Sequence, residues 1–267
     1  MKKELVKDLG FEFLRNKTKR EIENIVYLGD GVYFLGEVNG TNFITYDELL
    51  EWIWPEGEDF ANDSYISLRK DKKTKGNWLY FADSKYKNRG RTRFFYIAKK
   101  PILKLIPWNI LDNNCCVYGV DSKGAHVSTT IINDKEYIIR LPYGVGNFSL
   151  DNKVNDVNFL EDAKRKSENS EWNRTIVALV NSRKLNYSWL KHLNSNIMKD
   201  PTDMAHDGGD GQWTLCQEFI DDTNMVCVRG SGLADSKDGV AHFMAVERWA
   251  KEFFLGYRPV LEYFIYP

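Results

Sequence analysis

With 267 residues the chain is long enough for one large domain or two of ordinary size, and it can bury a hydrophobic core. Its 37 basic and 38 acidic side chains give a net charge of −1, which disfavours nucleic acid as a bulk electrostatic partner, because phosphate binding normally needs a basic excess. No stretch approaches the roughly 20 apolar residues of a membrane span, and the charged first residues are unlike a signal peptide. We therefore expect a folded protein that is made in the cytoplasm.

The first 95 residues predict a small module of helices and strands. Apolar spacing within 2–28 predicts two short helices. An Asn-Gly dipeptide at 39–40 lies between two β-rich runs and predicts a hairpin. The stretch 46–54 predicts a helix with Asp47 as its N-cap. We expect this α/β module to serve in attachment or assembly.

Residues 96–267 predict a second, larger unit. Trp172, Ile176 and Leu179 recur at helical spacing and predict a core helix over 171–180. The stretch 243–254 is also expected to be helical. Strands are expected at 78–81 and 93–98 in the first unit, and at 136–141, 213–218, 225–229 and 257–265 in the second.

Four cysteines occur, at positions 115, 116, 216 and 227, and none shows the Cys-x-x-Cys spacing of zinc sites. The sequence therefore predicts no metal site and no cofactor. Free thiols in a reducing compartment are the favoured interpretation. A disulfide between Cys216 and Cys227, opposed on neighbouring strands, stays open as an alternative.

The C-terminal part of the chain carries a series of short fragments. They are Lys99-Lys100-Pro101-Ile102 with Pro107-Trp108, Arg140-Leu141-Pro142, Glu171-Trp172-Asn173-Arg174, Trp213 with Gln217-Glu218, Arg229-Gly230, and Gly256-Tyr257-Arg258-Pro259-Val260. The series resembles domains of the formylglycine-generating-enzyme (sulfatase-modifying-factor) superfamily. The fragments other than those at 107–108 and 140–142, with the last one extended to Glu262, are more similar still to a group of bacteriophage-encoded proteins in which a short N-terminal module precedes such a domain. The resemblance covers about residues 95–267.

The resemblance implies an α+β protein in two parts. A small N-terminal α/β module, residues 1–95, would precede a C-type-lectin-like domain, residues 96–267, with a twisted antiparallel sheet, two helices and long loops. It also implies that the chain is similar to virion or tail-associated proteins, some of which display variable ligand-binding loops.

The enzymatic side of the superfamily is not expected here. Formylglycine-generating members use a cysteine pair after their Arg-Gly-Gly-Ser segment, and residues 231–240 contain no cysteine. Iron-dependent members need a clustered histidine motif, whereas the histidines here are scattered singly, at positions 126, 192, 206 and 242. We therefore expect no catalytic residue and no enzymatic activity.

Aromatic and ionic residues within the fragments are interpreted as structural anchors. A lone buried charge is costly, so these charges should pair with each other or with loop carbonyls. The expected anchors are Trp108, Arg140, Glu171, Trp172, Arg174, Trp213, Glu218, Arg229, Gly230, Gly256 and Arg258.

A ligand-binding surface is expected from the stretches 185–210 and 231–245, whose Gly, Ser, Asn and aromatic residues suit adaptable recognition. The carboxylates and glycines of 206–210 suit calcium, but the closing Glu of an EF-hand loop is missing, so a solvated turn is favoured. The expected ligand-binding residues are Tyr187, Trp189, His192, His206, Asp235, Lys237, His242 and Phe243.

Three functions remain in view. The favoured one is a non-enzymatic phage-type virion or tail-associated binding protein, which contacts a surface glycan or protein (itself, other virion proteins or a host protein) and forms a homo-oligomer. The first alternative is a phage-encoded soluble inhibitor that binds a host defence protein. The second is a metal-dependent or oxidative enzyme of the formylglycine-generating type. Synthesis in the host cytoplasm is expected for each, followed by incorporation into the virion in the first case.

Overall fold

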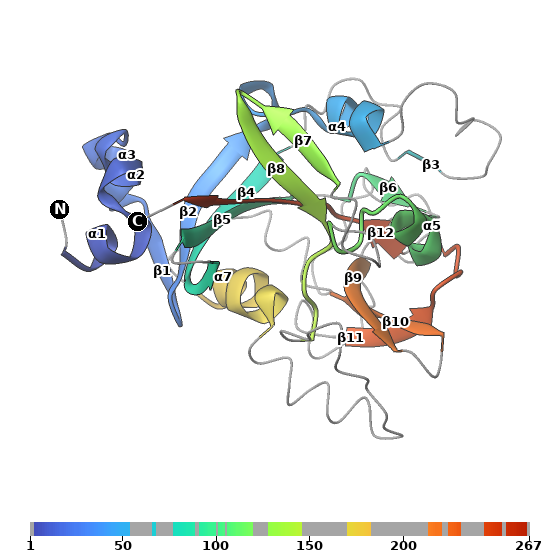
Figure 1. Ribbon diagram of the computed structural model, residues 1–267. Coiled ribbons are helices and arrows are strands. Elements are labelled where there is room, and N and C mark those ends of the chain that lie inside the picture. Colours follow the sequence, from blue (N-terminus) through green and yellow to red (C-terminus); the bar gives the residue numbers. More distant parts are fainter. Residues whose placement is uncertain are drawn as a thin grey trace, which may run out of the picture.

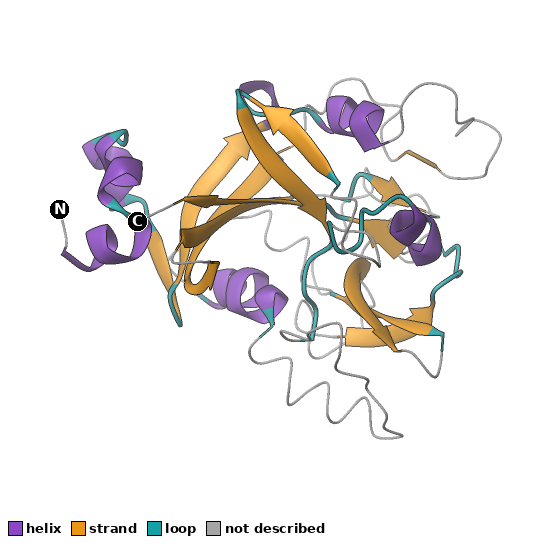
Figure 2. Cartoon of the chain, in the orientation of Figure 1, coloured by secondary structure: helices purple, strands orange, loops and turns teal. Residues whose placement is uncertain are grey.

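The computed structural model describes residues 3–53, 66–67, 77–88, 91–99, 101–104, 106–119, 128–145, 170–182, 213–220, 224–230, 243–252 and 255–265. They form two sheets with short helices around them, which confirms the α+β class (Figure 1 and Figure 2). Within these ranges, every helix is too short or too polar to span a lipid bilayer. The helical segments are α1 (Lys3–Leu9), α2 (Phe11–Arg15), α3 (Lys19–Glu23), η1 (Gly40–Asn42), α4 (Tyr46–Ile53), α5 (Trp108–Asn113), η2 (Asn173–Val177) and α7 (Ala178–Asn181).

The first sheet has seven strands, and every neighbouring pair in it is antiparallel. Strand β5 pairs with both β4 and β13, so the sheet joins strands from both sides of residue 95, the boundary expected from sequence. In spatial order the strands are β1 (Val26–Gly29), β2 (Val32–Asn39), β4 (Asn77–Asn88), β5 (Arg91–Ala98), β13 (Val260–Ile265), β8 (Lys135–Arg140) and β7 (Thr129–Ile132).

The second sheet has six strands and lies beyond the end of the first at which β13 begins (Figure 1). Its pairs are antiparallel except β12 with β9, which is parallel. In spatial order the strands are β11 (Phe243–Glu247), β10 (Met225–Arg229), β9 (Trp213–Ile220), β12 (Leu255–Tyr257), β6 (Leu103–Lys104) and β3 (Ile66–Ser67).

The centre of the first sheet is buried on both faces, because successive side chains of a strand point to opposite sides. On one face, Tyr80 and Tyr96 stack with ring centroids 4.2 Å apart in the larger hydrophobic cluster. On the other, Phe81 and Phe95 pack with Trp172 from the helix that begins at 171. Burial on both sides explains the continuous apolar runs at 78–82 in β4 and at 94–98 in β5.

The core helix predicted over 171–180 is confirmed, with a π-helical turn in its middle. Ser170 precedes it and accepts a hydrogen bond from the Asn173 backbone N–H, which satisfies one of the free donors at the helix start. Trp172, Ile176 and Leu179 all lie in the same hydrophobic cluster, as their spacing predicted.

Two predictions about turns and helices near the N-terminus were wrong. The Asn-Gly dipeptide at 39–40 does not form a hairpin, since β2 runs through Asn39 and the chain then enters the turn η1. The hairpin between β1 and β2 instead turns at Asp30 and Gly31, which both adopt the positive φ that such turns require. The stretch 2–28 contains three helices, not two, because Gly10 separates α1 from α2 with φ of 85°.

Two further local predictions need correction. The stretch 243–254 begins as the strand β11, because all five residues of β11 pair with β10 and this pairing overrides the helical spacing. Helix α4 is present, but Thr45 caps it in place of Asp47. The Thr45 hydroxyl accepts from the Glu48 backbone N–H at 3.2 Å, and the Glu48 carboxylate accepts from the Thr45 backbone N–H at 2.7 Å.

Candidate functional site

A group of six ionised side chains lies between the first sheet and the helix that begins at 171. We call it the ion cluster. Five of its members are buried, and Arg174 is half-buried. Its members are Asp83, Arg93, Arg140, Glu171, Arg174 and Glu262.

Glu171 is the centre of the ion cluster. Its carboxylate lies 2.6 Å from Arg140 Nη2 and 2.9 Å from Arg93 Nη1. Arg140 Nε also donates to Glu262 Oε2 at 2.6 Å, and Arg93 Nη2 donates to Asp83 Oδ2 at 3.0 Å. Strands β4, β5, β8 and β13 are therefore tied to the start of one helix by charged hydrogen bonds.

Arg174 extends the ion cluster to the first hairpin. Its Nη1 atom lies 2.8 Å from Asp83 Oδ2, and its Nη2 atom donates to the Asp30 backbone carbonyl at 2.9 Å. Asp30 is the turn residue between β1 and β2, and its carboxylate lies 3.2 Å from Arg174 Nε. Arg174 thus joins the η2 turn to the edge hairpin of the first sheet.

The charges within the ion cluster compensate one another. Burial alone would raise the pKa of Glu171, but the nearby Arg140 and Arg93 outweigh it and hold that pKa below its usual value. Burial likewise opposes the charge on Arg140, yet Glu171 and Glu262 keep its pKa well above the ordinary value. The ion cluster contains three arginines and three carboxylates, so its formal charges balance.

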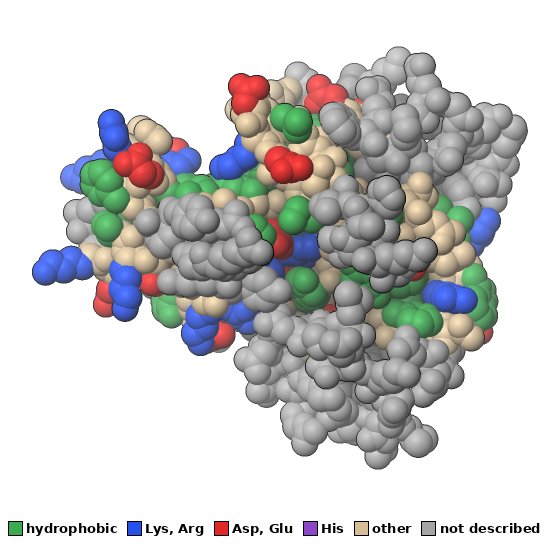
Figure 3. Space-filling model, in the orientation of Figure 1, with side chains coloured by type: hydrophobic (Ala, Val, Ile, Leu, Met, Phe, Trp, Pro, Cys, Tyr) green, Lys and Arg blue, Asp and Glu red, His purple; other side chains and the backbone are tan. Residues whose placement is uncertain are grey.

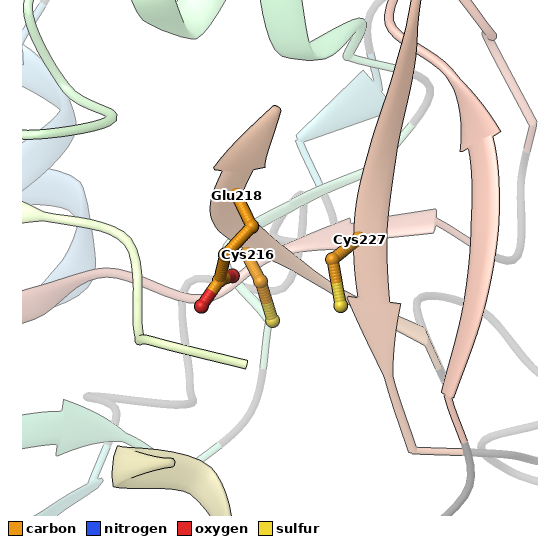
Figure 4. A group of neighbouring side chains, drawn as sticks. All are labelled: Cys216, Glu218 and Cys227. Carbon is orange, nitrogen blue, oxygen red and sulfur yellow. The ribbon is translucent and has the colours of Figure 1, made fainter. Parts of the chain in front are cut away.

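A second buried polar group lies in the other sheet. Cys216 and Glu218 project from β9 and Cys227 from β10, with their sulfur and carboxylate atoms gathered on one side of these strands (Figure 4). The two sulfur atoms and a carboxylate oxygen lie within 4.8 Å of one another. We call these three residues the thiol cluster. All four cysteines of the chain are free thiols, so the disulfide left open between Cys216 and Cys227 is not formed.

The segment that follows β8 completes the surroundings of the thiol cluster. The Glu218 carboxylate accepts backbone N–H bonds from Gly144, at 2.8 and 3.0 Å, and from Val145, at 2.9 Å. Burial raises the pKa of Glu218, although these N–H groups act in the opposite direction. Burial also raises the pKa of the Cys216 thiol well above its ordinary value.

Arg229 lies beside the thiol cluster and links it to the core helix. Its guanidinium donates to the Gly144 carbonyl and, at 2.5 Å, to Asn173 Oδ1. Burial lowers the pKa of Arg229, while Cys227, Cys216 and Glu218 raise it. Arg229 is the cation nearest to these three side chains among those that the structure describes with them.

Arg258 occupies a third buried position, between the two sheets. Its guanidinium donates to the carbonyls of Ala98, at 3.0 Å, and Lys99, and its Nε atom donates to Thr214 Oγ1 at 3.0 Å. Burial lowers the pKa of Arg258 to about 10. These bonds hold the junction of β12 and β13 against the end of β5.

Ten of the eleven expected anchors are buried, and Arg174 is half-buried. Trp172 lies in the cluster beneath the first sheet, and Trp108 donates from Nε1 to the Cys216 carbonyl at 2.9 Å. The buried anchors are Trp108, Arg140, Glu171, Trp172, Trp213, Glu218, Arg229, Gly230, Gly256 and Arg258.

Of the eight expected ligand-binding residues, the structure describes the backbone of one. Phe243 begins β11 opposite Arg229. Seven lie outside the described residues, namely Tyr187, Trp189, His192, His206, Asp235, Lys237 and His242.

Three charged residues of the ion cluster were missed from sequence. A usable signal existed for Arg93 and Glu262, because each is a charge inside a run of aromatic and β-branched residues, where exposure is not expected. Asp83 gives a weaker signal of the same kind. Cys216 and Cys227 do lie on neighbouring strands, as the alternative left open from sequence required, but they meet there as free thiols beside Glu218.

Comparison with known proteins adds no identification. No protein-family model, curated protein or solved structure matches the chain.

Proposed function

We propose that the chain is a non-enzymatic, phage-type virion or tail-associated binding protein on a C-type-lectin-like scaffold. It acts through contacts with other proteins or with a surface glycan. The observation that supports this most directly is the ion cluster. Arg140 comes from one of the fragments described above, Glu171 and Arg174 come from another, and the three side chains meet in one group.

A buried, charge-compensated group suits a rigid frame. Removing any member would leave a partner charge uncompensated in the core, so each member fixes the position of the others. The second sheet also fixes the positions of the residues that flank the stretch 231–242. Arg229 pairs with Phe243 on the neighbouring strand, so the stretch 231–242 starts and ends at adjacent positions of the second sheet. Such an arrangement suits a displayed binding loop.

The surface charges are also compatible with protein or glycan contacts. On the face shown in Figure 3, lysine and arginine side chains alternate with aspartate and glutamate over the end that α1, α2 and α3 form. A large field of one sign is the usual electrostatic footprint of nucleic-acid binding. The mixed surface instead favours protein or glycan partners, which are recognised by shape and local hydrogen bonding.

Mass spectrometry of purified particles from the encoding phage tests this proposal. We expect the chain in the particles at a fixed copy number relative to the major tail or capsid protein. Chemical cross-linking within those particles should also yield links between copies of the chain, since a homo-oligomer is proposed. Absence from the particle would overturn the virion assignment.

A loop variant tests the binding step. Trp189→Ala in the first of the two expected binding stretches should lower adsorption of the phage to its host. Trp249→Ala is the matched control, because Trp249 is an exposed tryptophan outside both stretches. Equal adsorption by wild type and the Trp189 variant would count against this stretch as the binding surface.

A soluble inhibitor of a host defence protein is the second candidate. The observation that favours it is the free state of all four thiols, which suits a reducing compartment. Early expression together with absence from particles would support this candidate. The formylglycine-type enzyme is the third, and tightly bound iron or copper in purified protein would support it.

A further inference from the structure

We propose that Cys216, Glu218 and Cys227 form a zinc-binding site that fastens β9 and β10 to the segment following β8. The inference does not rest on the proposed function. It rests on the convergence of two thiols and a carboxylate in a buried position (Figure 4).

The spacing of the three side chains suits a small tetrahedral ion. With Zn–S bonds of about 2.3 Å, two thiolate ligands of a tetrahedral zinc lie about 3.8 Å apart. The two sulfur atoms and the carboxylate oxygen already lie within 4.8 Å of one another. Small side-chain movements therefore bring all three to bonding distance. The fourth position of the ion is left for a water molecule.

The carboxylate is already oriented for this role. Gly144 and Val145 donate their backbone N–H groups to Glu218, and a carboxylate has acceptor positions for further partners. Outer hydrogen bonds of this kind commonly fix metal ligands in place. Gly144 is required at this point, since a Cβ atom there would approach the Cys216 sulfur to 2.7 Å.

The charges favour zinc in particular. Two thiolates and one carboxylate carry a charge of −3, which a divalent ion and the neighbouring Arg229 together neutralise. Calcium and magnesium prefer oxygen ligands, whereas two sulfurs with one carboxylate suit zinc. On binding, each thiol releases its proton to solvent as its Zn–S bond forms, so the buried site is neutral with and without the metal.

The site would add a further connection between segments of the chain that already contact one another. Strands β9 and β10 supply the ligands, and Glu218 holds the segment at 144–145. Arg229 continues the connection to Asn173 in the core helix. Zinc at this position would stabilise the second sheet against the helix, and the ion itself has no redox chemistry.

Metal analysis of the full-length chain tests the proposal. The protein is purified under reducing conditions, incubated with zinc sulfate and desalted, and its zinc content is measured by mass spectrometry. We expect one zinc per chain. Replacement by Co²⁺ should give the intense sulfur-to-cobalt charge-transfer absorption that reports thiolate coordination. If the wild-type protein holds no zinc after this incubation and gives no such absorption with Co²⁺, the proposal is overturned. This outcome does not depend on whether the variants below fold.

Serine variants identify the ligands. Cys216→Ser and Cys227→Ser should each weaken the charge-transfer band, since one thiolate is left, and should bind zinc at least tenfold more weakly. Cys116→Ser is the matched control, because Cys116 is also a buried thiol but lies in a different part of the core. Retention of zinc and of the full band by both test variants would overturn the assignment. Loss of zinc binding in the chain would leave its presence in phage particles unaffected, so the two proposals fail separately.

Discussion

The ion cluster and the thiol cluster solve the same problem of buried polarity in different ways. In the ion cluster, Glu171 is neutralised by Arg140 and Arg93, so compensation is complete within the fold. In the thiol cluster, the Glu218 carboxylate accepts hydrogen bonds from backbone N–H groups, and burial raises the pKa of the neighbouring Cys216 thiol. A set of paired ions holds strands together under any solution condition in which it stays ionised. The stability of the thiol cluster would depend in part on the zinc ion that we propose to bind there.

Breaking the ion cluster should have the largest effect. Glu171→Gln removes the charge that Arg140 and Arg93 share, so we expect a loss of about 3–5 kcal/mol in the free energy of unfolding. Urea denaturation at neutral pH measures it. The folded-state pKa of Glu171 is lowered, so its contribution is present above the unfolded-state pKa and is lost as the pH falls through the folded-state pKa. The gap between wild type and variant should therefore narrow in acid.

A surface ion pair provides the control for this prediction. Glu23→Gln removes an exposed partner of Lys19 and should change the free energy of unfolding by less than about 0.5 kcal/mol. A loss below about 1 kcal/mol in the Glu171 variant would contradict the role given to the ion cluster.

A charge-conserving change asks how much the geometry of the ion cluster contributes. Arg140→Lys keeps the positive charge but cannot donate to Glu171, Glu262 and the Leu141 carbonyl at once. We expect a loss of about 1.5–3 kcal/mol in urea denaturation, the range for hydrogen bonds to charged groups. Arg15→Lys, at an exposed position of α2, is the control and should be neutral. An equally neutral Arg140 variant would mean that charge alone suffices.

A substitution in the thiol cluster should lower the free energy of unfolding by less than one in the ion cluster. The difference between wild type and variant should grow only when zinc is present. In metal-free buffer, Cys227→Ala removes one small buried group and should cost about 1 kcal/mol. At zinc concentrations of about 100 times the wild-type dissociation constant, wild type should gain about 2.7 kcal/mol, and the variant, if its zinc affinity is lowered at least tenfold, should gain no more than about 1.4 kcal/mol. Thermal unfolding with and without zinc measures both. Equal gains in the two proteins would place the zinc elsewhere.

The smallest effect is expected at the capping box of α3, far from either cluster. Thr18→Ala removes the hydroxyl that accepts from the Glu21 backbone N–H and should cost about 0.5–1 kcal/mol in urea denaturation. Bonds from the Thr18 backbone and hydroxyl lower the pKa of Glu21 from 4.5 to about 2. This contribution is therefore present above about pH 4.5 and is lost as the pH falls towards 2. Lys19→Ala, at an exposed position in the same helix, should show no such dependence.

The sequence predicts those parts of the fold that local spacing determines. Trp172, Ile176 and Leu179 repeat at the helical period, and the structure places all three in one cluster under the first sheet. The stretches at 78–81 and 93–98 are likewise strands, although β4 and β5 extend further. Charged residues such as Arg229 and Arg258 were expected to pair with other charges or carbonyls, and both donate to backbone carbonyl oxygens.

Features that depend on distant pairing could not be predicted in this way. The ion cluster needs β13 beside both β5 and β8, and nothing local to Glu262 indicates these neighbours. The thiol cluster depends on an irregularity in the pairing of β9 and β10 between Val226 and Val228. The stretch after 243 has helical spacing, but the available edge of β10 decides its conformation.

The position of β13 inside the first sheet has a consequence for biosynthesis. Arg258 and its hydrogen-bond partner Ala98 are 160 residues apart, and β13 separates β5 from β8 in the finished sheet. The strands on either side of β13 are therefore translated long before the strand that joins them. Such high contact order slows folding and leaves unpaired, aggregation-prone strand edges exposed in the nascent chain. The first sheet is therefore complete only after the chain has been translated through Ile265.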